Sequence, residues 1–389
     1  MSLFLSTPYW QQLAGAAFLE LPELAGKRLT DLRSDPGEQD HASQFDMATL
    51  KGQGFTDEQV RQFLEMQAQL MDSKRRDKEA SSPARITRAL VERTGVPEPV
   101  WQRSGKEMLE AVLPIQSSNT QEIPAMESDS NGGETIAADS ARSMGFERIT
   151  LIADFPITRA TFGFSRVDYQ PQKCQLNPFS PDRDHEGRYP VFVDIVQADA
   201  LSIRLNPVNV WRWLELNGLS PNFPESASDQ DLAKRAYFIG LLDETLLGET
   251  LRADRAEERM VFGLLHTLSH LAIRQAALLC GLDSTSLSEY ILPKALTFSL
   301  YCNHRFGATI GALASLFEQS LGEWLQAIRE ADRCVYDPVC GDRGGSCHAC
   351  THLSETSCRF FNLNLGRSLL FGGHDPELGK INYGYFDIK

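Results

Sequence analysis

The chain has 389 residues, of which 42% are hydrophobic and 23% are charged, so it is long enough for about two or three domains with a sizeable core. Its net charge of −14 argues against a free-standing nucleic-acid binder, because such proteins present basic surfaces to the phosphate backbone. Residues 1–21 lack the basic start of a secretion signal, and the chain has no apolar run of roughly 18 residues. We therefore expect a cytoplasmic protein that contacts no membrane and keeps its thiols reduced.

The first part of the chain is expected to be a helical N-terminal region covering residues 1–115. Thr56 is a suitable helix N-cap, and apolar residues recur at helical spacing after it. Residues 116–146 are rich in Ser, Asn, Gly and acidic side chains, a composition typical of a flexible linker.

Residues 147–227 are expected to form a β-rich segment. Short apolar or alternating runs at 149–152, 160–164, 190–196 and 200–205 are divided by Pro and Gly, which favours strands. A short helix carrying Trp211 and Trp213 should end near Gly218. Two tryptophans at this spacing cannot share a helix face, so we expect packing in the core rather than stacking on bases.

The last part, residues 228–389, is expected to be mostly helical. Two helices are predicted between Asp229 and Leu279, with a break near Gly248, and Gly281 suits the position that ends the second. A strand from Leu296 to Tyr301 and a final long helix over 310–333, broken near Gly322, should follow.

Five of the eight cysteines lie between positions 334 and 358. In a reducing compartment such clustering indicates a metal site rather than disulfides. Cys347 and Cys350 have the C-x-x-C spacing that reaches one ion from a tight turn, and Cys340 and Cys358 flank them. We therefore predict one structural Zn²⁺ ion bound by Cys340, Cys347, Cys350 and Cys358. The fold class that follows is α+β, with a helical N-terminal region, a small β-rich part and a mostly helical C-terminal domain built around this site.

The choice of ligands has alternatives, because five thiols are available for four positions. Cys334 could replace Cys340 or Cys358, and His348 and His352 are more distant candidates. A closed site of four thiolates leaves no open coordination position, so the predicted zinc organises the C-terminus without performing chemistry.

Several motifs between Val261 and Leu370 occur together in a fixed order. They are Leu265–His270 on a helix, Gly281–Glu289, a strand ending at Tyr301, Cys334, Asp337–Cys340, Cys347–Cys350, Glu355–Cys358, Asn362 and Arg367–Leu370. This series, about 110 residues long, resembles the helicase-associated zinc-binding C-terminal domain of unknown function found in the MrfA repair helicase. It looks closer still to the version in DrmB of the DISARM anti-phage system.

The resemblance implies an accessory subunit of a helicase or translocase complex that acts on DNA, in DISARM-like anti-phage defence or in DNA repair. The partners it implies are a helicase or translocase protein and, mainly through that complex, DNA. It assigns no catalytic activity to this chain.

No complete catalytic motif is present in the sequence. The Gly-Lys pairs at 26–27, 105–106 and 379–380 are followed by Arg, Glu and Ile, so the phosphate-binding sequence G-x-x-x-x-G-K-[ST] is missing. His266 and His270 have the spacing of a metalloprotease helix, but Thr267 occupies the place of the general-base Glu. We expect both histidines to be hydrogen-bonded inside the domain, with a catalytic metal as the alternative.

Two other functions remain open from the sequence. Four acidic residues are scattered through the β-rich segment: Asp154, Asp168, Asp194 and Asp199. Because Asp194 ends a predicted strand, a place where nucleases often bind a metal, a metal-dependent nuclease is the first alternative. A zinc-stabilised scaffold without nucleic-acid contact is the second, favoured by the acidic charge. We expect no activity from the chain alone.

Overall fold

The computed structural model describes residues 2–4, 92, 120–124, 136–161, 163–166, 175–181, 188–221, 229–242, 248–302, 311–354 and 357–388. The chain divides into two compact units, the first comprising residues 1–11, 115–222 and 241–389, and the second residues 12–114 and 223–240. Apart from residue 92, the helices expected before residue 115 lie outside the described residues. No described helix is long and apolar enough to cross a lipid bilayer.

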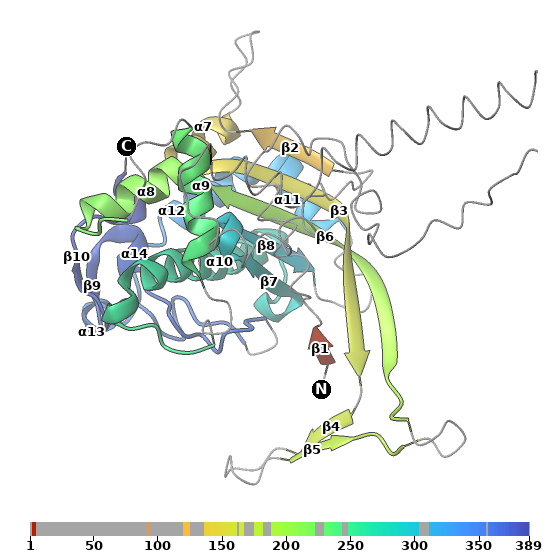
Figure 1. Cartoon of the computed structure of the whole chain (residues 1–389). Coiled ribbons are helices and arrows are strands. Elements are labelled where there is room, and N and C mark those ends of the chain that lie inside the picture. Colours follow the sequence, from red (N-terminus) through yellow and green to blue (C-terminus); the bar gives the residue numbers. More distant parts are fainter. Residues whose placement is uncertain are drawn as a thin grey trace, which may run out of the picture. The chain divides into compact units, whose positions relative to one another are not determined.

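The first unit is built on an antiparallel sheet with the strand order β1-β3-β6-β8-β7, to which β2 adds beside β3 (Figure 1). The strands of this sheet are β1 (Ser2–Phe4), β2 (Thr120–Pro124), β3 (Phe146–Thr161), β6 (Phe192–Leu205), β7 (Leu287–Leu292) and β8 (Thr297–Cys302). Strands from the expected β-rich segment and from the expected zinc domain therefore pair in one sheet, through β6 and β8.

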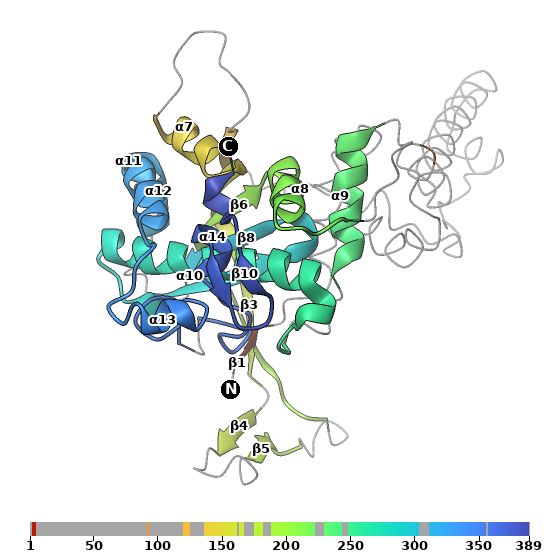
Figure 2. The same cartoon turned by 90° about the vertical axis from the view of Figure 1, so that its left-hand side faces the viewer.

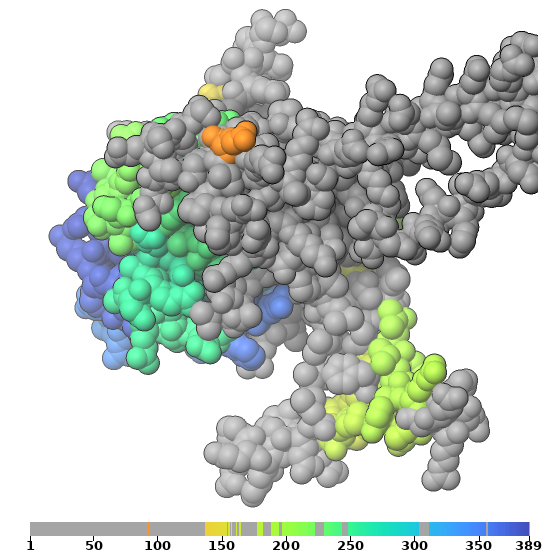
Figure 3. All heavy atoms as spheres, viewed as in Figure 1, coloured from red at the N-terminus to blue at the C-terminus, as the bar shows by residue number. Residues whose placement is uncertain are grey.

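The two longest strands, β3 and β6, replace the four short strands expected from the sequence. They stay paired from Phe146 to Thr161 because register shifts, one of them between Ile152 and Phe155, absorb the irregularities. The far end of the pair continues as an arm that ends near the hairpin of β4 (Gly163–Arg166) and β5 (Gln175–Pro178), seen as the yellow-green surface in Figure 3.

Helix α10 (Ala256–Cys280) is the longest described helix and runs across the first unit (Figure 2). Most of its side chains are buried. It contacts β7 and β8 of the sheet and four shorter helices: α8 (Pro207–Leu216), α11 (Ala312–Gln319), α12 (Leu321–Arg329) and α14 (Ser368–Phe371). Gly281 ends it in the left-handed conformation (φ 64°), as its sequence position predicted.

The remaining described elements are short. They are α7 (Ile136–Ser143), α13 (Val339–Asp342), β9 (Gly373–Asp375) and β10 (Gly379–Ile381), with 3₁₀ turns at Ala253–Arg255, Ser284–Ser286, Pro293–Ala295 and Tyr385–Asp387. Helix α9 (Gln230–Leu241) falls almost entirely in the second unit, where Leu232, Ala236 and Ile239 are buried.

The α+β class is confirmed, and several local details differ from the expectations. Helix 310–333 is split at Ser320, near the expected break at Gly322, and its second half ends at Arg329. The segment expected to be a linker contains β2, which pairs with β3, and α7, whose Ala141 is fully buried. Trp211 and Trp213 are buried in α8 as predicted, and the Nε1–H of Trp213 donates to the Tyr383 carbonyl at 2.9 Å.

Candidate metal centre

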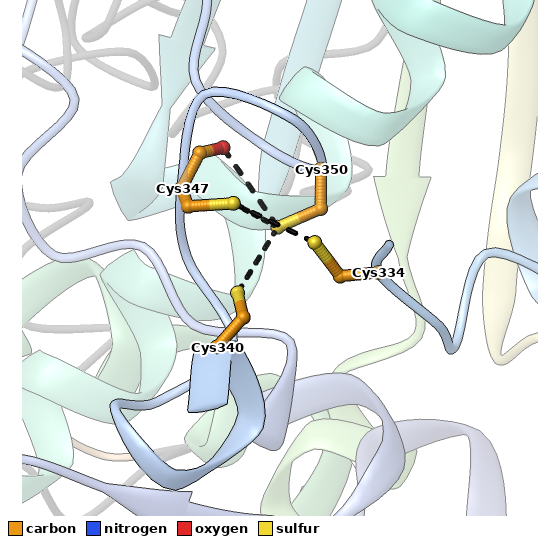
Figure 4. Close-up of side chains that lie close together, drawn as sticks. All are labelled: Cys334, Cys340, Cys347 and Cys350. Carbon is orange, nitrogen blue, oxygen red and sulfur yellow. Dashed lines mark hydrogen bonds between the residues drawn. The ribbon is translucent and has the colours of Figure 1, made fainter. Parts of the chain in front are cut away.

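Four cysteine side chains converge between the end of α12 and α14. The Sγ atoms of Cys334, Cys340, Cys347 and Cys350 all lie within 4.8 Å of one another (Figure 4). Three of these separations are 3.6 Å for Cys334–Cys347, 3.7 Å for Cys340–Cys350 and 3.6 Å for Cys347–Cys350. In a tetrahedral zinc site with Zn–S bonds of about 2.3 Å, the sulfur atoms stand about 3.8 Å apart. The four thiols therefore have the spacing of a closed tetrahedral metal site.

The first two cysteines are positioned by a turn that Asp337 stabilises. Its carboxylate accepts hydrogen bonds from the backbone N–H of Cys334 at 2.7 Å and of Gly341 at 3.0 Å. Cys340 lies in the short helix α13 that follows this turn. One side chain thus fixes the distance between the two thiols.

The second pair, Cys347 and Cys350, sits on a tight turn that α10 holds from outside. The Cys350 N–H donates to the Cys347 carbonyl at 3.1 Å. Arg274 of α10 donates to the carbonyl of Ala349 at 2.7 Å and to that of His352 at 3.3 Å. These bonds occupy carbonyls that the turn would otherwise leave without a partner.

A buried arginine lies beside the cluster. Arg367 donates from Nη2 to the Asp337 carboxylate at 2.8 Å and from Nε to the Gly345 carbonyl at 3.2 Å. Its hydrogen bond to Asp337 is the main reason that the pKa of that carboxyl lies below its usual value. A fixed positive charge at this place favours thiolates in the neighbouring cysteines.

The thiols differ in how readily they ionise. Burial is the main cause that raises the pKa of Cys340 to about 12, although a hydrogen bond from Arg367 opposes it. For Cys347 burial also acts upward, but hydrogen bonds from the Ala349 backbone and from Cys334 outweigh it, and the pKa falls to about 7. Of Cys340 and Cys347, Cys347 therefore offers a thiolate to an ion more easily.

The structure differs from the sequence prediction in one member of the set. Cys340, Cys347 and Cys350 lie together as expected, but the fourth thiol in the cluster is Cys334, and Cys358 belongs to another group. The bend that Asp337 stabilises brings Cys334 back onto the C-x-x-C turn. Sequence spacing alone did not show whether Cys334 or Cys358 is the fourth thiol of the cluster. His348 and His352 are not in the cluster; their rings pack against each other, and His352 Nε2 lies 3.1 Å from Ser346 Oγ.

Cys358 lies instead with His266, His270 and Glu289, and the candidate ligand atoms of these four residues are also within 4.8 Å of one another. The histidines are buried and hydrogen-bonded inside the unit, as their spacing on α10 suggested. Burial is the main influence on the His266 imidazole and lowers its pKa, which favours the neutral ring. Glu289 carries no sequence signal of a metal ligand beyond its place at the end of the motif Gly281–Glu289.

Close packing brings the chain after Cys358 against α10. At Gly263 a Cβ atom would stand 2.6 Å from a Leu369 methyl group and 2.7 Å from the Asn364 carbonyl oxygen. One turn later on the helix, His266 Nδ1 is 2.8 Å from the Leu363 carbonyl. A glycine at 263 therefore lets the segment approach closely enough to meet the histidine.

The acidic residues considered for a nuclease are not gathered in the described structure. Asp199 accepts a hydrogen bond from the Gly311 backbone N–H, and burial raises its pKa. Asp168 and the side chains of Asp154 and Asp194 lie outside what the structure describes. Neither candidate metal cluster in the described residues includes Asp199.

Comparison with known proteins gives one relative to report, and no family model matches the chain. The chain is 27% identical over 212 residues to the DISARM protein DrmB of Bacillus paralicheniformis (strain ATCC 9945a / NCIMB 11709 / CD-2). The alignment covers 49% of this chain and 34% of that protein, so the chain spans about a third of the relative's length. The chain is thus similar, over about half of its length, to a DISARM protein.

Proposed function

We propose that this chain is an accessory component of a DISARM-related anti-phage complex, in which it binds a helicase or translocase and helps that partner engage DNA. The observation that carries the proposal is the 27% identity to the DISARM protein DrmB. The ordered motifs of the helicase-associated domain support it further, because those described in the structure fold into one unit around α10.

In this proposal a structural zinc ion occupies Cys334, Cys340, Cys347 and Cys350. Four sulfur donors at tetrahedral spacing suit Zn²⁺ and leave no open position for a substrate. Four thiolates around one Zn²⁺ leave a surplus of negative charge, and Arg367 stands beside Cys340 to offset part of it. The ion would hold the loop 334–350 rigid against α10.

The loop that carries the first two cysteines offers a surface for a partner. Val335, Tyr336 and Val339 are 85%, 64% and 58% exposed. Exposed apolar side chains gathered in one patch can mark a protein-binding surface, and tyrosine is enriched at such surfaces. We assign this surface, defined by Val335, Tyr336 and Val339, to the contact with the helicase or translocase.

The charge of the chain determines how it would take part in DNA binding. A protein with net charge −14 is repelled by the phosphate backbone. Its own affinity for DNA should therefore be weak and should fall further as salt is raised. The partner would supply most phosphate contacts, and this chain would orient the partner.

The test is copurification followed by DNA binding. The tagged full chain is expressed with a helicase or translocase from a DISARM-related system, and DNA binding is measured for the chain, the helicase and the pair. We expect the pair to form and to bind DNA more tightly than either protein, and we expect Cys347→Ser to remove the gain. Cys280→Ser, at a cysteine outside both clusters, is the matched control and should retain it.

Two outcomes contradict the proposal. Tight DNA binding by the isolated chain at physiological salt, without any pairing, would indicate a self-sufficient DNA-binding protein. A stable pair whose DNA affinity equals that of the helicase alone would indicate a zinc-stabilised scaffold without nucleic-acid contact.

A further inference from the structure

A second group of metal-ligand side chains lies inside the first unit, apart from the four-cysteine cluster. His266 and His270 come from α10, Glu289 from β7 and Cys358 from the loop before α14. All four residues are almost completely buried, with both histidines at 0% exposure and Glu289 at 5%. Three separate elements thus bring nitrogen, oxygen and sulfur ligand atoms together at one buried place.

Hydrogen bonds fix which atom each histidine directs to this point. His266 Nδ1 is 2.8 Å from the Leu363 carbonyl oxygen, and His270 Nδ1 is 2.7 Å from the Thr351 carbonyl oxygen. A carbonyl oxygen can only accept, so both Nδ1 atoms carry a proton. Each ring therefore points its Nε2 inward, an arrangement that metal-binding histidines share when the other nitrogen donates to a carbonyl.

The inward atoms include more acceptors than donors, because with both imidazoles neutral only the Cys358 thiol, whose Sγ is 3.3 Å from His266 Nε2, has a proton to donate. His266 Nε2 and His270 Nε2 lie 3.3 Å and 3.4 Å from the same Glu289 oxygen, Oε1. In neutral imidazoles these nitrogens hold lone pairs, and so does the carboxylate oxygen. Buried lone pairs that converge in this way cost free energy unless a cation lies between them.

The simplest alternative to a bound cation is a protonated histidine paired with Glu289. The distances from the two Nε2 atoms to Glu289 Oε1 favour the cation. A charge-assisted N–H···O bond has a length of about 2.7–2.9 Å, shorter than either contact to Oε1. In a tetrahedral zinc site with bonds of about 2.0–2.3 Å, neighbouring ligand atoms stand roughly 3.3–3.6 Å apart. The contacts to Oε1 have that length, and so does the 3.3 Å separation of His266 Nε2 and Cys358 Sγ.

We propose that His266, His270, Glu289 and Cys358 bind a second, structural zinc ion. A donor set of two imidazoles, one carboxylate and one thiolate suits Zn²⁺, and its two negative charges neutralise the ion in a buried place. Ser269 Oγ hydrogen-bonds the other oxygen of Glu289 and holds the carboxylate in position. With four protein ligands in an almost completely buried place, the site is closed and leaves no coordination position for a substrate.

The proposed ion would join β7 and the 358 loop to α10. It would also connect the two clusters, because His270 contacts the carbonyl of Thr351, the residue that follows Cys350. The two sites share no ligand, so a variant of one site leaves all four ligands of the other in the chain.

The test measures bound metals in the purified full chain, prepared without chelator and analysed for all first-row transition metals. We expect about two zinc ions per chain. Cys358→Ser and His270→Gln should each lower the content to about one, and Cys347→Ser should also leave about one. Cys280→Ser is the matched control and should leave two. A content of one zinc in the wild-type chain that Cys358→Ser does not change would overturn the proposal.

X-ray absorption at the zinc edge of the wild-type chain supplies a readout that no folding defect of a variant can disturb. The two occupied sites together contain five thiolates, four in one and one in the other. The average zinc should therefore have between two and three sulfur neighbours together with imidazole scattering. Four sulfur neighbours and no imidazole would mean that only the cysteine cluster is occupied. One sulfur neighbour with imidazole would retain this proposal while removing zinc from the cysteine cluster.

Discussion

Nε2 of His266 lies 3.3 Å from Sγ of Cys358, although 92 positions separate the two residues in the chain. This contact places Cys358 in the buried group on α10, and Cys334 takes the fourth position beside Cys340, Cys347 and Cys350. The unit thus has two four-residue groups of metal-ligand type where the sequence analysis predicted one.

The thiol of Cys334 should matter as much for metal binding as that of Cys340. Cys334→Ser removes one of four sulfur donors at tetrahedral spacing, so we expect it to lower the zinc content by about one ion per chain and to match Cys340→Ser. Metal analysis of the two purified variants checks this. An unchanged zinc content in Cys334→Ser, with a loss in Cys340→Ser, would return Cys334 to the role of a spare thiol.

Removing metal should destabilise the fold. Metal binding adds to folding stability when the unfolded chain lacks the site, so extraction with a strong chelator should lower the midpoint of thermal unfolding. Restoring zinc should raise it again. Differential scanning calorimetry on the full chain measures both steps, and equal midpoints with and without metal would contradict a structural role for the ions.

Removing one partner of the buried ion pair between Arg259 and Asp375 should strongly destabilise the fold. Arg259 Nη2 is 2.8 Å from Asp375 Oδ2, and both side chains are nearly inaccessible. Asp375→Ala leaves the guanidinium charge buried without its carboxylate, so we expect a loss of about 3–5 kcal/mol in the free energy of unfolding. Asp375→Asn keeps the shape and should cost less. Urea titration of the three proteins gives these values, and a neutral effect of Asp375→Ala would contradict the prediction.

Gly145 should tolerate no side chain. Its φ is 73°, and an added Cβ would stand 2.6 Å from Tyr385 Oη, which donates to the Gly145 carbonyl at 2.8 Å. Gly145→Ala should therefore cost more than the roughly 1–2 kcal/mol of left-handed backbone strain alone. Gly218→Ala is the control, because Gly218 has a similar φ of 81° and no atom within 4 Å of the added Cβ. Chemical denaturation that gives the two variants equal stabilities would show that the Tyr385 contact is unimportant.

The exposed surface of Val335, Tyr336 and Val339 should affect partner binding without affecting metal. Val335→Asp combined with Tyr336→Ser places polar groups on this surface and leaves every cysteine in place. We expect the zinc content to stay the same and copurification of the helicase to fall by about tenfold or more, since a loss of about 1.4 kcal/mol is tenfold in affinity. The matched control is Leu278→Ser on α10, another exposed apolar residue (75%). Equal recovery of the helicase by both variants would place the contact elsewhere.

The sequence by itself determined the features that depend on neighbouring residues. Periodicity and turn residues predicted the α+β class, the short tryptophan helix and the end of α10 at Gly281. The C-x-x-C spacing and clustering of cysteines indicated a metal-binding region, because a tight turn brings two nearby thiols to one point whatever the rest of the chain does.

Only the tertiary structure decided how the ligand-type residues are grouped. Cys358 is eight positions from Cys350 but packs with residues of α10 and β7, because the close approach at Gly263 and the carbonyls of Leu363 and Thr351 bring its loop to the histidines. Glu289 joins them from a strand that no sequence pattern had indicated. Contacts between distant segments depend on how strands pair and helices pack, and residue spacing carries no information about either.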